Sequence, residues 1–328
     1  MGKYETAMNP SRNFLQKAEG RLDAIDHYRG FAIVLMVLAD YLSRVELVPP
    51  WLKHAPGSGL TVVDLIGPFF ILAIGMTFKP SWQRRLARDG RKETVLHFIR
   101  RFLALIGIGM LTPRGYSWGL FQTIGGASLI SLLVIGMPDL VRLAVGGALL
   151  GGYQVLSDQV WMGRVTGTSS WCEIEGTLGW AAMLILATVL ADWFYKQTRD
   201  QRKFLLGSLG FLGLGIILSA WIKVSQYFVS ASYVLITLGV SGVLFLGFHL
   251  LSEKLPIRLP LLAAWGKNPL ILYLLHYWLW VIIFLFPESS AWHIQAPLWL
   301  ILLQGVGFVG ILSLIAWYLD RRGWILSL

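Results

Sequence analysis

A histidine and an aspartate that could act together, His54 and Asp64, lie ten residues apart in the stretch from Trp51 to Phe70. This stretch leaves one apolar segment, turns through proline and glycine, and enters a second apolar segment. Charged groups at such a membrane boundary are costly unless they have a function or a partner. Imidazole has a pKa suited to proton transfer near neutral pH, and a neighbouring carboxylate can stabilise its protonated form. The pair therefore predicts an active site in which His54 is a general base or a nucleophile.

Other polar groups interrupt the apolar segments themselves. Asp40 stands alone in the first segment, where an unpaired carboxylate would be expensive. We expect it to be protonated or paired, with the His54–Asp64 pair as its partner. In the ninth segment, Asn268 and His276 are eight residues apart and share one helix face. Two polar groups on one stripe favour the wall of a polar cavity, although a histidine in such a place is often only a hydrogen-bonded packing residue.

Several polar residues stand near the ends of apolar segments. Arg100 and Arg101 lie just inside the third segment, where an arginine either binds an anion or extends its head group to the membrane surface. Gln122 places an amide at the start of the fourth segment, where a contact within the bundle would explain it. Glu175 precedes the sixth segment. Lys223 is the one basic residue of its turn and a candidate for binding acidic ligand groups.

The composition is that of a membrane protein. Of the 328 residues, 55% are hydrophobic and only 14% are charged, with 15 tryptophans, and the mean hydropathy is +0.62. Soluble domains carry more charge. The net charge of +10 is concentrated beside the apolar segments, where it orients helices and meets anionic lipids, so nucleic-acid binding is not expected. The single cysteine, Cys172, excludes an intrachain disulfide and argues against a cysteine-based metal site.

Ten apolar segments approach the length that an α-helix needs to cross the hydrocarbon, about 20 residues. They lie near residues 30–48, 60–78, 95–112, 119–137, 138–156, 176–195, 204–222, 229–251, 264–286 and 296–318. The boundary between the fourth and fifth segments is a tight turn that contains Pro138. These segments predict an all-α, polytopic bundle of about ten transmembrane helices.

The basic residues indicate the orientation of this bundle. With the N-terminus in the cytoplasm, 23 of the 28 Lys and Arg residues fall on the cytoplasmic side and 5 on the other. The positive-inside rule then predicts that both termini are cytoplasmic and that His54 is extracytoplasmic. Residues 1–20 lack an apolar core, so we expect a cytoplasmic tail without a cleavable signal, followed by one membrane domain over residues 21–328. Arg29 is expected at the lipid head groups.

Common catalytic motifs are missing from the sequence. It has no Walker loop, no dinucleotide-binding glycine pattern, and neither a His-Glu-x-x-His nor a Gly-x-Ser-x-Gly motif. It also has no clear internal repeat, which argues against a secondary transporter.

Several short motifs together resemble the heparan-α-glucosaminide N-acetyltransferase family. They occur in order from about residue 21 to 277, and they include Arg21-Leu-x-x-Ile-Asp26-x-x-Arg29-Gly30, Lys53-His54-Ala55, Gly59-Leu-Thr-Val-x-Asp64, Gly119-x-x-Gln122, Glu175-Gly176-x-Leu178, Lys223 with Ser232-Tyr233-Val234-Leu235, and Gly266-x-Asn268 with Tyr273-x-x-His276. The resemblance implies transfer of an acetyl group from cytoplasmic acetyl-CoA, across the membrane, to the amino group of a glucosamine. It implies a bacterial-type, inner-membrane member that lacks the lumenal domain of the lysosomal enzyme, and possible homodimers.

The resemblance also suggests roles for residues. His54 is the family's catalytic histidine and Asp64 its carboxylate partner, whereas Asp40 departs from the family pattern, which has Asn there. The phosphates of acetyl-CoA need cations, for which Arg100, Arg101 and Lys267 are candidates. Gln122, Asn268 and His276 are expected further along the acetyl-CoA path. Lys223, Ser232 and Glu175 are expected to bind the acceptor.

Three functions stay open from the sequence. The first is the N-acetyltransferase, with His54 either as a general base in direct transfer or as a carrier of the acetyl group. The second is an O-acyltransferase that modifies a cell-envelope glycan or its lipid-linked precursor with the same histidine. The third is a permease in which Asp40, Asp64 and His276 relay protons.

Overall fold

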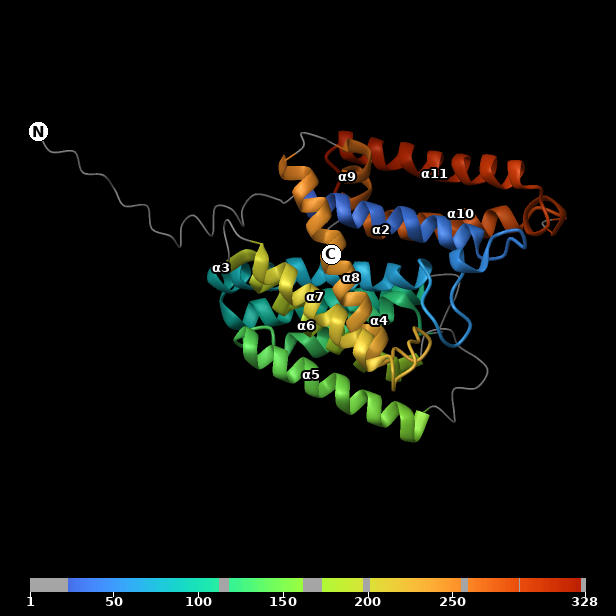
Figure 1. Ribbon diagram of the computed structural model, residues 1–328. Helices are drawn as coiled ribbons and strands as arrows, with labels where there is room; N and C mark the ends of the chain where they lie inside the picture. Colours follow the sequence, from blue (N-terminus) through green and yellow to red (C-terminus); the bar gives the residue numbers. More distant parts are fainter. Residues whose placement is uncertain are drawn as a thin grey trace, which may run out of the picture.

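The computed structural model describes residues 23–111, 118–161, 173–196, 201–254, 259–288 and 290–325, and all regular structure within them is helical (Figure 1). The α-helices are α2 (Asp23–Leu42), α3 (Ile66–Met110), α4 (Leu120–Leu132), α5 (Asp139–Leu156), α6 (Glu173–Lys196), α7 (Arg202–Leu218), α8 (Ala231–Lys254), α9 (Pro260–Lys267), α10 (Pro269–Phe284) and α11 (Leu298–Arg321). Short helical turns lie at Pro50–Leu52 (η1), Val63–Leu65 (η2), Ser157–Trp161 (η3) and Ser290–Ile294 (η4). The predicted tail over residues 1–20 lies outside the described residues.

Among the described residues, five helical segments are long and apolar enough to cross a membrane. They are Val63–Met110, Asp139–Val160, Ile174–Lys196, Ala231–Glu253 and Leu298–Arg321. The chain is therefore a polytopic helical membrane protein, as its composition predicts. Two further apolar helices, Leu120–Leu132 and Pro269–Ile282, are shorter than this length.

Some predicted segments have different bounds in the structure. The second and third are joined in α3, which is interrupted at Gly90 (φ 77°, ψ 174°), a backbone conformation that glycine adopts without strain. The ninth is divided at Asn268, because Pro269 lacks an amide proton and disfavours the helical conformation in the residue before it. The first already includes Asp23, the first residue that the structure describes.

The helices form two packing units. The central unit contains α3 to α8, which pack around α6. In the most apolar stretch of α6, 83% of the residues are buried. The outer unit contains α2, α9, α10 and α11, which lie together on one side of the molecule (Figure 1). Helix α2 packs in both hydrophobic clusters, through Tyr28 in the first and Val37 in the second. It therefore joins the two units.

Glycines allow α2 and α9 to cross in backbone contact. A Cβ atom on Gly30 would lie 1.9 Å from the carbonyl oxygen of Leu262, and one on Gly266 would lie 1.8 Å from that of Asp26. Small residues permit such close approach between membrane helices. The crossing holds Arg29 and Lys267, which neighbour these glycines in the chain, on facing helices.

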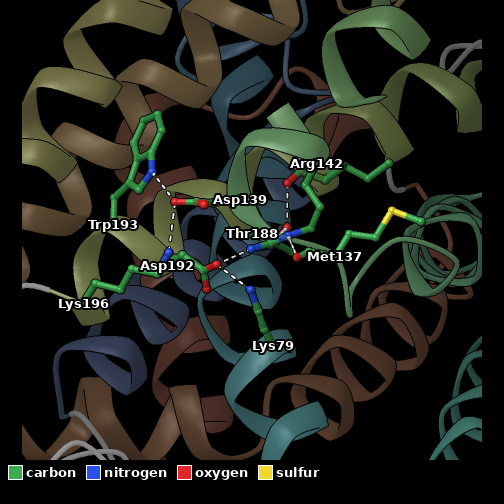
Figure 2. A network of polar contacts seen from close by, with 9 residues as sticks. Lys79, Met137, Asp139, Arg142, Thr188, Asp192, Trp193 and Lys196 are labelled. Carbon is green, nitrogen blue, oxygen red and sulfur yellow. Dashed lines mark hydrogen bonds and ion pairs between the residues drawn. The ribbon is translucent and has the colours of Figure 1, made fainter. Parts of the chain in front are cut away.

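A buried network of charges ties α5 and α6 to α3 (Figure 2). Asp192 on α6 pairs with Arg142 on α5 and with Lys79 on α3, the latter at 2.5 Å. Arg142, which is fully buried, also donates to the hydroxyl of Thr188 at 2.5 Å and to the carbonyl oxygen of Met137 at 3.1 Å. Removing one partner of a buried ion pair lowers the stability of a protein by roughly 3–5 kcal/mol, because it leaves the other charge uncompensated. We conclude that this network fixes the central unit.

Candidate active site

His54 and Asp64 lie in direct contact. The Nδ1 atom of His54 is 2.8 Å from Oδ1 of Asp64, so the predicted pairing is confirmed. The imidazole side chain is 42% exposed and the carboxylate is completely buried. An ionised carboxylate only accepts hydrogen bonds, which places the proton of a neutral His54 on Nδ1. In this tautomer the lone pair of the neutral imidazole is on Nε2.

The carboxylate of Asp64 is held by its own loop. Its Oδ2 atom accepts hydrogen bonds from the backbone amide of Thr61 at 2.9 Å, from the Thr61 hydroxyl at 3.0 Å and from the amide of Ala55 at 3.4 Å. The buried Tyr233 of α8 donates its hydroxyl to the backbone carbonyl of Asp64 at 2.7 Å. These contacts compensate for burial of the charge and fix the direction from which Asp64 meets His54.

The loop that carries His54 is anchored to the turn between α7 and α8. The amide of Gly59 donates to the carbonyl of Val224 at 2.8 Å, and the hydroxyl of Ser225 donates to the carbonyl of Gly57. Both glycines have positive φ, 82° at Gly57 and 113° at Gly59, which disfavours other residues there. Lys223, one residue before Val224, is exposed beside this junction. The structure therefore brings Lys223 into the neighbourhood of the His54 loop.

A second histidine–aspartate pair forms between α10 and α2. The Nε2 atom of His276 is 3.0 Å from Oδ2 of Asp40, with the histidine side chain 1% exposed and the aspartate 32%. The expectation that Asp40 pairs with His54 and Asp64 is wrong, because α2 and α10 pack together and bring His276 to Asp40. Among the described residues, the Nδ1 atom of His276 has no hydrogen-bond partner.

A cavity of about 350 Å³ lies between the two packing units, lined by residues of α2, α3, α4, α9 and α10. Three cations line it, Arg29, Arg101 and Lys267, while its other walls are almost entirely apolar. Ser128 also lines the cavity, and its buried hydroxyl has no hydrogen-bond partner among the described residues. Phe70 lines the cavity too and follows Asp64 by less than two turns of helix. Of the residues that line the cavity, Phe70 is the one nearest in sequence to the His54–Asp64 pair.

The remaining cofactor candidates are dispersed. Arg100 is exposed and lies outside the cavity lining, unlike its neighbour Arg101. Gln122 is buried, and its side-chain oxygen accepts from the amide of Gly119 at 3.2 Å. Asn268 is buried at the junction of α9 and α10 and donates to the carbonyl of Trp324 at 2.9 Å. His276 is held by Asp40. The predicted polar stripe of Asn268 and His276 therefore makes contacts within the bundle and does not line this cavity.

The candidate acceptor residues differ in accessibility. Ser232 is fully buried in α8, with its hydroxyl 3.1 Å from that of Ser230. Glu175 is partly buried near the start of α6. Lys223 is the exposed member of the three. On the described residues, Lys223 is thus the one best placed to meet a soluble acceptor.

Two residues of the site were not singled out from the sequence. Tyr233 appeared only as a motif residue, and its contact with Asp64 joins residues 169 positions apart, which no local pattern reveals. Arg29 was expected at the head groups, but it lines the cavity and donates to the hydroxyl of Thr77 at 3.0 Å. The sequence feature that could have indicated a role for Arg29 is that it directly precedes a glycine, Gly30, at the start of an apolar segment.

The chain shows distant, partial similarity to known proteins. Residues 21–140 match a family described as "Domain of unknown function (DUF5009)". The chain is 36% identical to human heparan-α-glucosaminide N-acetyltransferase over 97 residues, which is 29% of this chain and 14% of the human protein. It is 33% identical to the mouse protein over 102 residues, or 30% of this chain and 15% of that protein. The similarity thus spans a small part of these relatives and establishes a distant relation to a membrane N-acetyltransferase.

Proposed function

We propose that this protein is a membrane acetyltransferase that moves the acetyl group of cytoplasmic acetyl-CoA to the amino group of a glucosamine-type sugar on the other side of the membrane. The His54–Asp64 pair is the observation on which the proposal depends. An accessible imidazole with a buried, hydrogen-bonded carboxylate on its Nδ1 atom is the arrangement of a general base. The distant similarity to a membrane N-acetyltransferase supports the same chemistry.

In the proposed reaction, His54 accepts a proton at Nε2 from the acceptor amine as the amine nitrogen bonds to the carbonyl carbon of the thioester. The bond between that carbon and sulfur breaks, and the imidazolium returns the proton to the departing thiolate. Asp64 stabilises the imidazolium in between. We favour direct transfer over an acetyl-histidine, because Asp64 orients His54 for proton transfer and one protonation cycle of Nε2 then balances the reaction.

The cavity between the packing units has the residues to hold acetyl-CoA. Arg29, Arg101 and Lys267 would bind its phosphates, since charge-assisted hydrogen bonds to phosphate are strong. The apolar walls suit the pantetheine arm, and Ser128 offers one polar group along them. Lys267 also pairs with Asp320 at 2.6 Å, so part of its charge is already balanced. Arg29 and Arg101 are therefore the stronger candidates.

An O-acyltransferase is the second candidate, because the same base would activate a hydroxyl group. A permease is third: the pairing of Asp40 with His276, apart from the His54–Asp64 pair, interrupts the continuous relay that this function would need.

Product chemistry tests these functions. Purified protein in liposomes, given acetyl-CoA labelled in the acetyl group and glucosamine, should yield N-acetylglucosamine that resists hydroxylamine. A hydroxylamine-labile product would indicate O-acylation. Transport of intact glucosamine without acetyl-CoA, abolished by a protonophore, would contradict both acyltransferase proposals. Label that stays on acid-quenched protein and is lost in His54→Ala would replace direct transfer with an acetyl-histidine route.

A further inference from the structure

A second hollow lies in the outer unit, between the end of α2, the outer part of α11 and the chain that joins α10 to α11. It has a volume of about 640 Å³ and is lined mainly by Tyr41, Phe286, Trp292, Gly307, Phe308 and Ile311. We call it the α11 groove. It is separate from the cationic cavity, with which it shares no lining residue.

The walls of the α11 groove offer almost no free polar groups. The one amide in its lining, Gln304, accepts a hydrogen bond from the Tyr41 hydroxyl at 2.6 Å and donates to the carbonyl of Trp292 at 2.9 Å. Both ends of this amide are therefore used by the protein. A sugar would lose hydrogen bonds to water in such a groove without replacement, whereas a hydrocarbon chain would lose none.

The groove has the surroundings of a lipid-chain site. Its lining residues on α11 run from Gln304 to Ile311, which is about 10 Å along a helix, or about a third of a bilayer core of about 30 Å. The adjacent outward side chains of α11 are apolar and strongly exposed, among them Leu303 (63%) and Val306 (72%). They face lipid in a membrane, so a chain can enter the groove from the side.

A cation stands near the outer end of the groove. The guanidinium of Arg44 lies 4.7 Å from the ring centre of Trp280. The same turn is attached to the Trp292 segment by the hydrogen bond from the Glu46 amide to the Ile294 carbonyl, at 2.9 Å. Arg44 is exposed and lies two residues after the end of α2 at Leu42 and three residues after Tyr41, which lines the groove. A cation above an apolar groove complements a phosphate attached to a hydrocarbon chain.

We propose that the α11 groove binds the hydrocarbon chain of a lipid-linked amino sugar, with Arg44 at the phosphate, and that this lipid is the acetyl acceptor. The second half of this inference rests on the proposed acetyltransferase function. The segment that joins α10 to α11, the loop between α2 and α3, which carries His54, and the turn between α7 and α8 all lie at the same end of the molecule (Figure 1). A lipid anchored in the groove would keep its sugar at the surface that carries His54.

Two glycines of α11 provide a matched pair of variants. A Cβ atom on either Gly307 or Gly310 would meet no atom within 4 Å, so neither position opposes a side chain locally. Gly307 lines the groove and Gly310 does not. Gly307→Trp therefore fills the groove, while Gly310→Trp adds the same bulk to the same helix outside it.

The binding test uses a long-chain isoprenoid phosphate that carries a photoreactive diazirine in its chain. Wild-type protein and Gly310→Trp should be labelled equally on α11. Labelling of Gly307→Trp should be at least about tenfold weaker, because losing contact with only two methylene groups of the chain already lowers the affinity by about that factor. Arg44→Gln should weaken labelling by the phosphate but not by the uncharged alcohol. Equal labelling of Gly307→Trp and wild type would overturn the site, and full competition by bulk phospholipid would show an ordinary lipid groove.

The acceptor test compares two substrates. Gly307→Trp should raise the KM for glucosamine linked through phosphate to the isoprenoid chain about tenfold or more, and leave turnover of free glucosamine unchanged. If both substrates are affected alike, the groove does not select the acceptor. If labelling follows the prediction but the wild type acetylates neither sugar, the lipid site stands and the acetyltransferase function fails.

Discussion

The two histidine–aspartate pairs have nearly the same contact distance, 2.8 Å for His54 with Asp64 and 3.0 Å for His276 with Asp40, but opposite burial. In the first pair the imidazole is exposed and the carboxylate is buried, and in the second the imidazole is buried and the carboxylate is partly exposed. A reactive base must reach its substrate, whereas its partner needs only to be fixed. The burial pattern therefore supports the proposal that His54, rather than His276, transfers the proton.

The pairs also differ in how they are built. Asp64 is held by donors from its own loop, so the pair is a local unit set on the end of α3. Asp40 and His276 come from helices 236 residues apart in sequence, so their contact joins α2 to α10. We interpret the second pair as a positioning contact between helices.

Removing the two histidines should separate these roles most strongly. His54→Ala should lower kcat for acetyl transfer by about 10²–10⁴-fold, the usual contribution of a general base. His276→Ala should lower kcat less than about tenfold but destabilise the fold by about 1–3 kcal/mol, because the carboxylate of Asp40 loses its partner. Turnover and thermal unfolding in detergent measure both effects. Near wild-type turnover in His54→Ala would refute the proposed mechanism, and equal kinetic losses in both variants would refute the division of roles.

Changing Asp64 to Asn tests the buried half of the first pair. Asparagine keeps the size of the side chain but loses the negative charge that stabilises the imidazolium. We expect a loss in kcat on the order of 10²-fold, the lower end of the contribution of a general base, with little change in KM. A loss confined to KM would instead place Asp64 in substrate binding.

Adjacent arginines test whether the cationic cavity serves the His54 pair. Arg101→Gln should raise the KM for acetyl-CoA at least about tenfold, because a hydrogen bond to a charged group contributes about 1.5–3 kcal/mol. Arg100→Gln removes the same charge one residue away, outside the cavity lining, and should leave KM unchanged. Steady-state kinetics with varied acetyl-CoA measure the contrast. Similar KM values for the two variants would mean that acetyl-CoA does not use this cavity.

The smallest effect is expected for Asp40→Asn. An amide oxygen can still accept a hydrogen bond from Nε2 of His276. The free energy of unfolding should therefore change by less than about 1 kcal/mol, and kcat by less than about fivefold. The pH profile of kcat/KM should keep its position, since Asp40 contacts His276 and makes no hydrogen bond to His54. A shift of that profile would show that the charge of Asp40 reaches His54 and that the two pairs are coupled.

Membrane class, helical composition and the first pair could be predicted from the sequence because they depend on local properties. Long apolar segments require helices in a bilayer, and the turn between α4 and α5 was found where Pro138 indicates it. A short loop that contains two glycines joins His54 to Asp64, and so short a loop keeps the two residues close in space. Helix bounds were less accurate where backbone geometry at Gly90 and Pro269 decided them.

Only the tertiary structure decided which distant residues meet. Nearly every face of a membrane helix is apolar, so its pattern does not indicate which helices become neighbours. The partner of Asp40, the clamp of Tyr233 on Asp64, and the choice of Arg29 and Arg101 over Arg100 all depend on how α2, α3, α8 and α10 pack. The sequence indicated that an imidazole and a carboxylate meet in the loop before α3, and helix packing decided which histidine is exposed.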